Sequence, residues 1–153
     1  MSEREKQAAA NFAAGHNCAQ SVLMAYADVL GLTAEQAAMV SVGFGGGMGR
    51  LRLHCGAFSA AVMLAGALEG DNGAEKEHRP QTYARVQEIH RRFVEMNGTV
   101  SCAALLGKAG VPEDPTPEER TPEYYRKRPC ARIIGSACQL IDAMLAEKEQ
   151  HDA

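Results

Sequence analysis

Apolar residues recur at helical spacing along most of the chain. In the segment 18–30 they fall three or four residues apart, and 81–96 and 130–147 repeat this pattern. The segment 56–68 is apolar on nearly every side, which is typical of a central buried helix. Shorter helices are predicted for residues 3–14, 34–42 and 101–106. The sequence therefore predicts an all-α fold, an irregular bundle of about six or seven helices within a single domain of residues 1–153.

Two stretches interrupt the helical pattern. Residues 43–49 contain five glycines in seven positions, so neither a helix nor a strand is expected there. Residues 108–129 hold five of the six prolines together with many charges, and are predicted to be a long loop with a helical turn near 123–126. A loop of this length in a small domain tends to be functional or to wrap the surface.

Composition and charge exclude several classes of protein. Apolar residues make up 46% and charged residues 23% of the chain, and the net charge is −3, which argues against nucleic acid or an anionic membrane as the main partner. The first seven residues are charged and lack an apolar stretch, unlike a secretory signal. The longest apolar run, 55–68, is shorter than the roughly 20 residues of a membrane span. We therefore expect a cytoplasmic protein without a membrane span.

Five cysteines carry the candidate chemistry. In a cytosolic chain this number favours catalytic, redox or metal-binding use over static disulfides. Four of them lie within one turn of a predicted helix start, where free N–H groups and the helix dipole stabilise a thiolate: Cys18, Cys55, Cys102 and Cys130. Cys138 lies two turns inside its helix and is predicted to pack in the core.

Basic residues next to these cysteines are expected to lower the pKa of the thiols further. His16 precedes Cys18, and three basic residues, 126–128, precede Cys130. Three basic residues and a helix start act on Cys55, which is therefore the predicted nucleophile, with Cys18 or Cys102 resolving the intermediate. The neighbours of Cys55 are Arg50, Arg52 and His54.

The expected topology brings these helix starts together. Short connections favour antiparallel neighbours, so the helices beginning near Cys18, Cys55 and Cys102 are predicted to start at the same end of the bundle. The long proline-rich loop is free to bring Cys130 there as well.

The residues around the cysteines also resemble a known family. The chain is similar to the putative redox-active protein family, which is named for its pattern of a Cys, a CGAxxG motif and two further Cys. The resemblance covers about residues 12–146 and implies a redox role without specifying the reaction. Ala60 stands where the motif has its second Gly, so the chain departs from the pattern there. The matching segments are Gly15-His-Asn-Cys18, the glycine-rich 43–49, Cys55-Gly-Ala-Phe-Ser-Ala60, Cys102-Ala-Ala-Leu-Leu-Gly107 and Cys130-Ala-Arg-Ile-Ile-Gly.

Two chemistries fit four convergent cysteines. In the first, the protein is a thiol-dependent oxidoreductase or electron carrier that acts on an unknown redox partner. In the second, it is a non-enzymatic module whose four thiolates, Cys18, Cys55, Cys102 and Cys130, hold an iron–sulfur cluster or zinc. No two of them form the Cys-x2–4-Cys pair of most structural zinc sites.

The glycine-rich loop is the candidate for binding near the cysteines. It matches neither a dinucleotide fingerprint nor a P-loop. We expect the backbone of Gly45, Gly46 and Gly47 to approach the cysteine site and donate N–H groups to sulfur. His16 and His54 are candidate ligands or proton relays. The Ala- and Gly-rich segment 56–68 suits close packing within one chain or between copies in a homo-oligomer.

Overall fold

The described residues, 1–107 and 114–152 of a computed structural model, are helical and contain no β-strand, as predicted. The α-helices are α1 (Glu3–Ala13), α2 (Cys18–Ala25), α3 (Ala34–Ser41), α4 (Gly45–Met48), α5 (Gly56–Met63), α6 (Ala65–Glu69), α7 (Arg79–Asn97), α8 (Cys102–Leu106), α9 (Pro122–Lys127) and α10 (Cys130–Asp152). Three short 3₁₀ helices join them: η1 (Ala27–Leu30), η2 (Val42–Phe44) and η3 (Lys76–His78).

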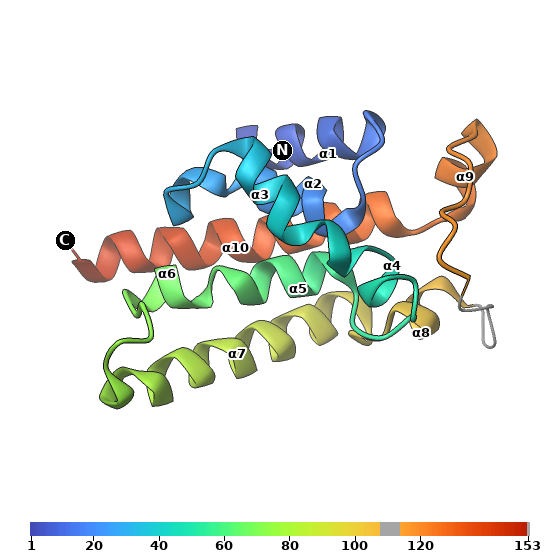
Figure 1. The fold of residues 1–153 in the computed structure, drawn as a ribbon. Coiled ribbons are helices and arrows are strands. Elements are labelled where there is room, and N and C mark those ends of the chain that lie inside the picture. The colour runs from blue at the N-terminus through green and yellow to red at the C-terminus, as the bar shows by residue number, and fades with distance from the viewer. Residues whose placement is uncertain (108–113, 153) are drawn as a thin grey trace.

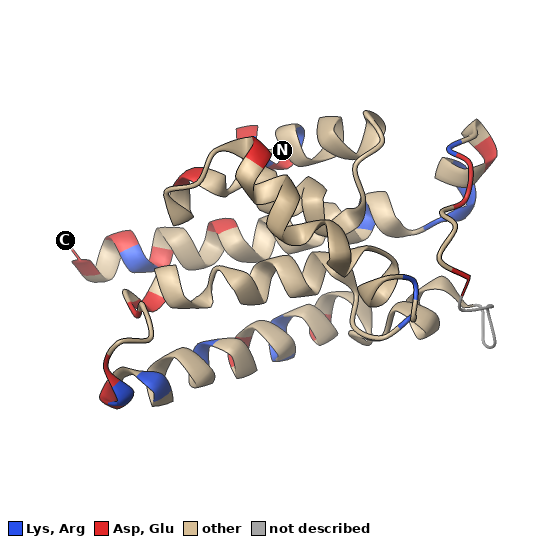
Figure 2. Cartoon of the chain, viewed as in Figure 1, with Lys and Arg blue, Asp and Glu red and all other residues tan. Residues whose placement is uncertain are grey.

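The core forms around α2 and α5. Helix α2 packs against α1, α3, α5 and α10, and α5 also contacts α7 and α10 (Figure 1). Fully buried side chains come from several of these helices, including Leu23, Tyr26, Phe93 and Ile141. Figure 2 shows that α5 carries no charged residue, whereas charges follow the length of α7. The segment 56–68 is thus the central buried segment, as its composition predicts.

Two predicted helices are divided in the structure. The predicted helix over 18–30 ends at Ala25 and continues as η1, because the backbone leaves helical geometry at Tyr26 (φ −119°, ψ 15°). The hydroxyl of Tyr26 donates to the carboxylate of Asp142, at 2.7 Å, and ties this break to α10. The predicted helix over 56–68 is divided at Leu64 into α5 and α6.

The proline-rich segment forms a strap, residues 114–129, which holds α9 at one end of the bundle (Figure 1). Helix α9 confirms the predicted helical turn near 123–126; the rest of the predicted loop, 108–113, lies outside the described residues. The Arg120 side chain anchors the strap, because its guanidinium donates to the carbonyls of His16 (3.1 Å) and Phe12 (3.4 Å). The guanidinium also stacks on the rings of Phe12 and Tyr124.

The starts of α2, α5, α8 and α10 gather at the end of the bundle where α4 and the strap also lie (Figure 1). This is the arrangement that short antiparallel connections predict. Within residues 1–107 and 114–152, no helix is long and apolar enough to cross a membrane.

Candidate thiol site

Four cysteines from distant parts of the chain line one small cavity. They are the first or capping residues of four helices: Cys55 caps α5, and the others begin α2, α8 and α10. The cavity measures about 20 Å³, room for about one water molecule, and is completed by apolar side chains of α8 and α10. The convergence expected from the topology is confirmed. The cysteines are Cys18, Cys55, Cys102 and Cys130.

A short backbone bridge holds the starts of α5 and α8 together. The N–H of Cys55 donates to the carbonyl of Val100 at 2.7 Å, and the N–H of Cys102 donates to the carbonyl of Leu53 at 2.6 Å. The residues between, His54 and Ser101, form an isolated antiparallel bridge. Two cysteines that are far apart in the sequence are thus fixed by main-chain hydrogen bonds.

Asn17 joins the start of α2 to the glycine-rich segment. Its side-chain oxygen accepts from the N–H of Gln20 at 3.0 Å and forms a capping box, while its Nδ2 donates to the carbonyl of Val42 at 2.9 Å. A Cβ on Gly45 would overlap the Asn17 side chain, so only glycine permits this approach. Sequence reasoning missed Asn17, although Asn17-x-x-Gln20 is a readable capping signal.

The glycine-rich segment turns left-handed rather than forming an ordinary loop. Gly46 and Gly47, inside α4, have φ values of 66° and 69°. Three residues with side chains also adopt positive φ: Met48 (70°), Arg50 (65°) and Arg52 (60°). This conformation costs about 1–2 kcal/mol for each such residue. The prediction of unusual backbone angles is confirmed, and the strain extends past the glycines to both arginines.

This backbone brings main-chain donors to the sulfur of Cys18. The side chain of Cys55 and the backbone groups of Gly46, Gly56 and Ala19 all act to lower its pKa. The side chain of Cys55 is the largest influence, and together these groups outweigh burial and lower the pKa of Cys18 to about 6. The predicted contact between the glycine backbone and a thiolate is therefore present at Gly46.

Cys55 behaves in the opposite way to Cys18. Its interaction with Cys18 and its burial both raise the pKa of the Cys55 thiol, and the N–H groups at the start of α5 only partly oppose this. The basic neighbours are not directed at Cys55. Arg52 instead lies with its Nη1 3.8 Å from the sulfur of Cys102, and the exposed His54 packs edge-on against Phe58.

The other cysteines are held as thiols. Burial raises the pKa of Cys102, and the nearby Arg52 guanidinium opposes it. Burial and the charge on Cys18 raise the pKa of Cys130 to about 11, with Arg128 opposing. Cys138 is fully buried away from the cavity, as predicted for a core residue, and burial raises its pKa to about 12.

The two predicted histidines do not reach the sulfurs. Neither His16 nor His54 is among the described residues that line the cysteine cavity. His16 contributes its backbone carbonyl, which accepts from Arg120. The ring of His54 lies against Phe58. No contact within the described residues supports its expected role as a ligand or proton relay.

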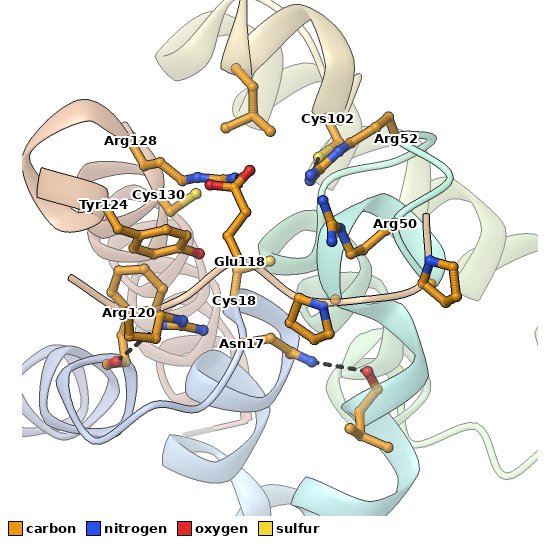
Figure 3. Close-up of a pocket in the computed structure, with 18 residues that line it drawn as sticks. Asn17, Cys18, Arg50, Arg52, Cys102, Glu118, Arg120, Tyr124, Arg128 and Cys130 are labelled. Carbon is orange, nitrogen blue, oxygen red and sulfur yellow. Dashed lines mark hydrogen bonds and ion pairs between the residues drawn. The ribbon is translucent and has the colours of Figure 1, made fainter. Parts of the chain in front are cut away.

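A larger pocket of about 320 Å³ opens over Cys18 (Figure 3). Cys102 and Cys130 also line it, whereas Cys55 lies behind them in the smaller cavity. One wall comes from the glycine-rich segment and the facing wall from the strap (Figure 3). Sequence reasoning did not single out the polar wall residues of the strap, because nothing in their spacing ties them to a cysteine: Glu118, Arg120 and Tyr124.

Four clustered cysteines could also serve as metal ligands. Across residues 1–107 and 114–152, no three His, Cys, Asp or Glu side chains are placed to hold one ion.

The sequence is similar to a known protein family and to a known protein. The model of the family described as "Putative redox-active protein (C_GCAxxG_C_C)" matches residues 16–144. A protein of Archaeoglobus fulgidus, described as "Uncharacterized protein", is 26% identical over 141 residues, which cover 87% of each chain. No solved structure matches the chain.

Proposed function

The chain belongs to the putative redox-active protein family, and on that basis we propose that it is a dithiol–disulfide oxidoreductase. Cys18 is the attacking thiolate and Cys55 is the resolving thiol. The contact between these two sulfurs carries the proposal, because one is stabilised as a thiolate and its neighbour as a thiol. This pairing suits an exchange reaction, in which a thiolate attacks first and a second thiol follows.

Access supports the same order of events. Cys18 lines the open pocket and is half-buried, while Cys55 is 6% exposed and lies behind it. A substrate entering the pocket therefore reaches Cys18 before Cys55. Because the pKa of Cys18 is about 6, its side chain is mostly a thiolate at neutral pH.

The proposed reaction is balanced as follows. The Cys18 thiolate attacks one sulfur of a substrate disulfide, so that a mixed disulfide forms and the other half leaves as a thiolate. Attack removes the negative charge on Cys18 that raises the pKa of Cys55, so Cys55 releases its proton more easily to the departing thiolate. The Cys55 thiolate then attacks the Cys18 sulfur and releases the second half. The substrate gains two electrons, and the protein gains a Cys18–Cys55 disulfide.

The proposed roles of Cys102 and Cys130 follow from their place beside this pair. Both line the same small cavity and are held as thiols. After deprotonation, one of them can attack the Cys18–Cys55 disulfide and the other can complete a new disulfide. The oxidation would thereby pass within the cluster and return Cys18 and Cys55 to the reduced state.

The test is a reaction of the fully reduced protein with bis(2-hydroxyethyl) disulfide, followed by acid quenching and non-reducing peptide mapping. We expect two thiols released per disulfide consumed and a Cys18–Cys55 disulfide. Cys55→Ser is expected to accumulate the mixed disulfide on Cys18, and Cys18→Ser to lose the fast reaction. Cys138→Ala is the matched control, because that cysteine is buried away from both cavities.

Two results would overturn the proposal. One is a mixed disulfide that forms first on Cys55 in the unmodified protein. The other is protein purified without oxygen that holds stoichiometric zinc or iron, with all four cluster cysteines protected from alkylation until a chelator is added.

A further inference from the structure

Resting on this proposed function, we propose that the pocket over Cys18 selects small disulfides that carry carboxylate groups. The inference concerns the substrate class, and it comes from the charges on the pocket wall rather than from the cysteines. Among the described residues, four arginines and a single acidic residue line the pocket (Figure 3). Arg50 and Arg52 come from the glycine-rich segment, and Arg120 and Arg128 come from the strap.

Arg52 gives the strongest indication that the pocket binds an anion. Its side chain is 8% exposed, and its Nε–H has no acceptor among the described residues. Within residues 1–107 and 114–152 no ion pair includes Arg52, and its one hydrogen bond goes to the sulfur of Cys102 at 3.8 Å. A buried guanidinium without a carboxylate is costly, and an anion in the pocket would relieve that cost.

Arg50 supplies a second available charge on the same wall. It is half-buried, and no ion pair of the described chain includes it. Hydrogen bonds from Thr116 lower the pKa of the exposed Asp114, and the charge on Arg50 adds a smaller contribution. Both Arg50 and Arg52 adopt a left-handed backbone (φ 65° and 60°). The strained segment thus directs two cations toward one pocket, and strain of this kind is typical of functional sites.

The two arginines of the strap are already engaged. Arg128 pairs with Glu118, the acidic residue of the pocket wall. Arg120 donates to the carbonyls of Phe12 and His16 and stacks on aromatic rings. Its charge still contributes to the field in the pocket, but three hydrogen bonds hold its guanidinium against α1, Tyr125 and His16. Arg50 and Arg52 are therefore the groups that remain to bind carboxylate.

Size and cover favour a small molecule over a protein substrate. The volume of about 320 Å³ lies at the lower end of small-ligand pockets. The strap lies over one side and is anchored to α1 through Arg120 (Figure 3). A disulfide within a folded protein would have to displace the strap to reach the sulfur of Cys18.

The test uses three small linear disulfides that differ mainly in charge: 3,3′-dithiodipropionate (dianion), bis(2-hydroxyethyl) disulfide (neutral) and cystamine (dication). The rate of mixed-disulfide formation at Cys18 is measured in Cys55→Ser protein at low ionic strength. Each rate is divided by the rate of the same disulfide with 2-mercaptoethanol, which removes differences in intrinsic reactivity. In each case the Cys18–sulfur bond forms, the substrate S–S bond breaks, and one small thiolate leaves with the bonding electrons.

We expect the dianion to react at least about tenfold faster than the dication, with a preference that falls as salt is added. Arg50→Gln and Arg52→Gln should each reduce that preference several-fold, whereas Arg52→Lys should retain most of it. Glu118→Gln should increase it. Arg91→Gln on the exposed face of α7 is the matched control, because Arg91 pairs only with Glu95.

The outcomes separate the substrate class from the reaction. If all three disulfides react rapidly at Cys18 with equal normalised rates, or if cystamine reacts fastest, the substrate class proposed here is wrong and the proposed function stands. If none reacts at Cys18 while a folded protein disulfide does, the pocket does not select a small substrate. Slow reaction of every disulfide at Cys18 contradicts the proposed function itself.

Discussion

The side chains of Cys55 and Cys18 meet in one small cavity, and this one interaction moves the pKa values of the two cysteines in opposite directions. Both residues lie at helix starts, so that feature alone does not distinguish them. The difference is that Cys18 collects main-chain donors from its own helix, from the start of α5 and from the glycine-rich segment. The negative charge is therefore held on Cys18 and the proton on Cys55.

The stability of the reduced protein should depend on pH through Cys18. Its pKa is lowered from 9.0 to about 6 on folding, so it favours the folded state fully above pH 9, and this contribution is lost as pH falls toward 6. The free energy of unfolding should therefore rise between pH 6 and 9 by up to about 1.4 kcal/mol per pH unit. Above pH 9 the raised pKa of Cys55 reverses the trend, because the unfolded thiol ionises first.

Urea unfolding of Cys18→Ala at the same pH values isolates this contribution. The difference in free energy of unfolding between the two proteins should grow from pH 6 to 9. A constant difference across that range would show that Cys18 titrates alike in the folded and unfolded states.

Gly56→Ala should disturb both the position and the reactivity of the Cys18 sulfur. A Cβ on Gly56 would lie 2.5 Å from the sulfur of Cys18 and 3.0 Å from the carbonyl oxygen of Phe44. We expect a loss of about 1–3 kcal/mol in the free energy of unfolding and at least about tenfold slower alkylation of Cys18 at pH 7. Gly43→Ala is the control, because its Cβ would meet nothing within 4 Å. Equal behaviour of the two variants would exclude the close approach at Gly56.

Arg52→Gln should make Cys102 less reactive. The guanidinium lies 3.8 Å from the Cys102 sulfur and lowers its pKa against the effect of burial. Without that charge, the pKa of Cys102 should rise further, and its alkylation at pH 8.5 should slow by about three- to tenfold. Peptide mapping with a mass-tagged alkylating agent resolves each site. An unchanged rate at Cys102 would indicate that Arg52 does not act on its sulfur.

Helical periodicity and the short connections between helices were sufficient to predict the helical bundle. They also predicted that the four cysteines converge at one end of it. The segment 56–68 is apolar on every side and occupies the centre, and short connections return the helix starts to one end. The core position of Cys138 followed from its place inside α10. These features depend on local spacing and connection length, which the sequence contains directly.

The differences in pKa among the cysteines depend on contacts between residues that are distant in the sequence, and no local sequence pattern contains these contacts. Arg52 follows the glycine-rich segment, and its left-handed backbone turns the side chain to Cys102 instead of the neighbouring Cys55. The N–H of Gly46 reaches Cys18 only because Asn17 holds that segment against α2. Counting basic residues before a cysteine therefore points to the cluster of four cysteines but not to the contacts that distinguish Cys18 from Cys55.

The most direct test of the account is the pH profile of alkylation at Cys18 in the fully reduced protein, read by mass spectrometry at each cysteine, beside the same profile in Cys55→Ala. The account predicts that Cys18 is labelled first, with a midpoint near pH 6. In Cys55→Ala that midpoint should rise by at least about one pH unit, because the largest stabilising donor is gone. Labelling of Cys55 before Cys18, or a Cys18 midpoint near the free-thiol value of about 8.5, would contradict it.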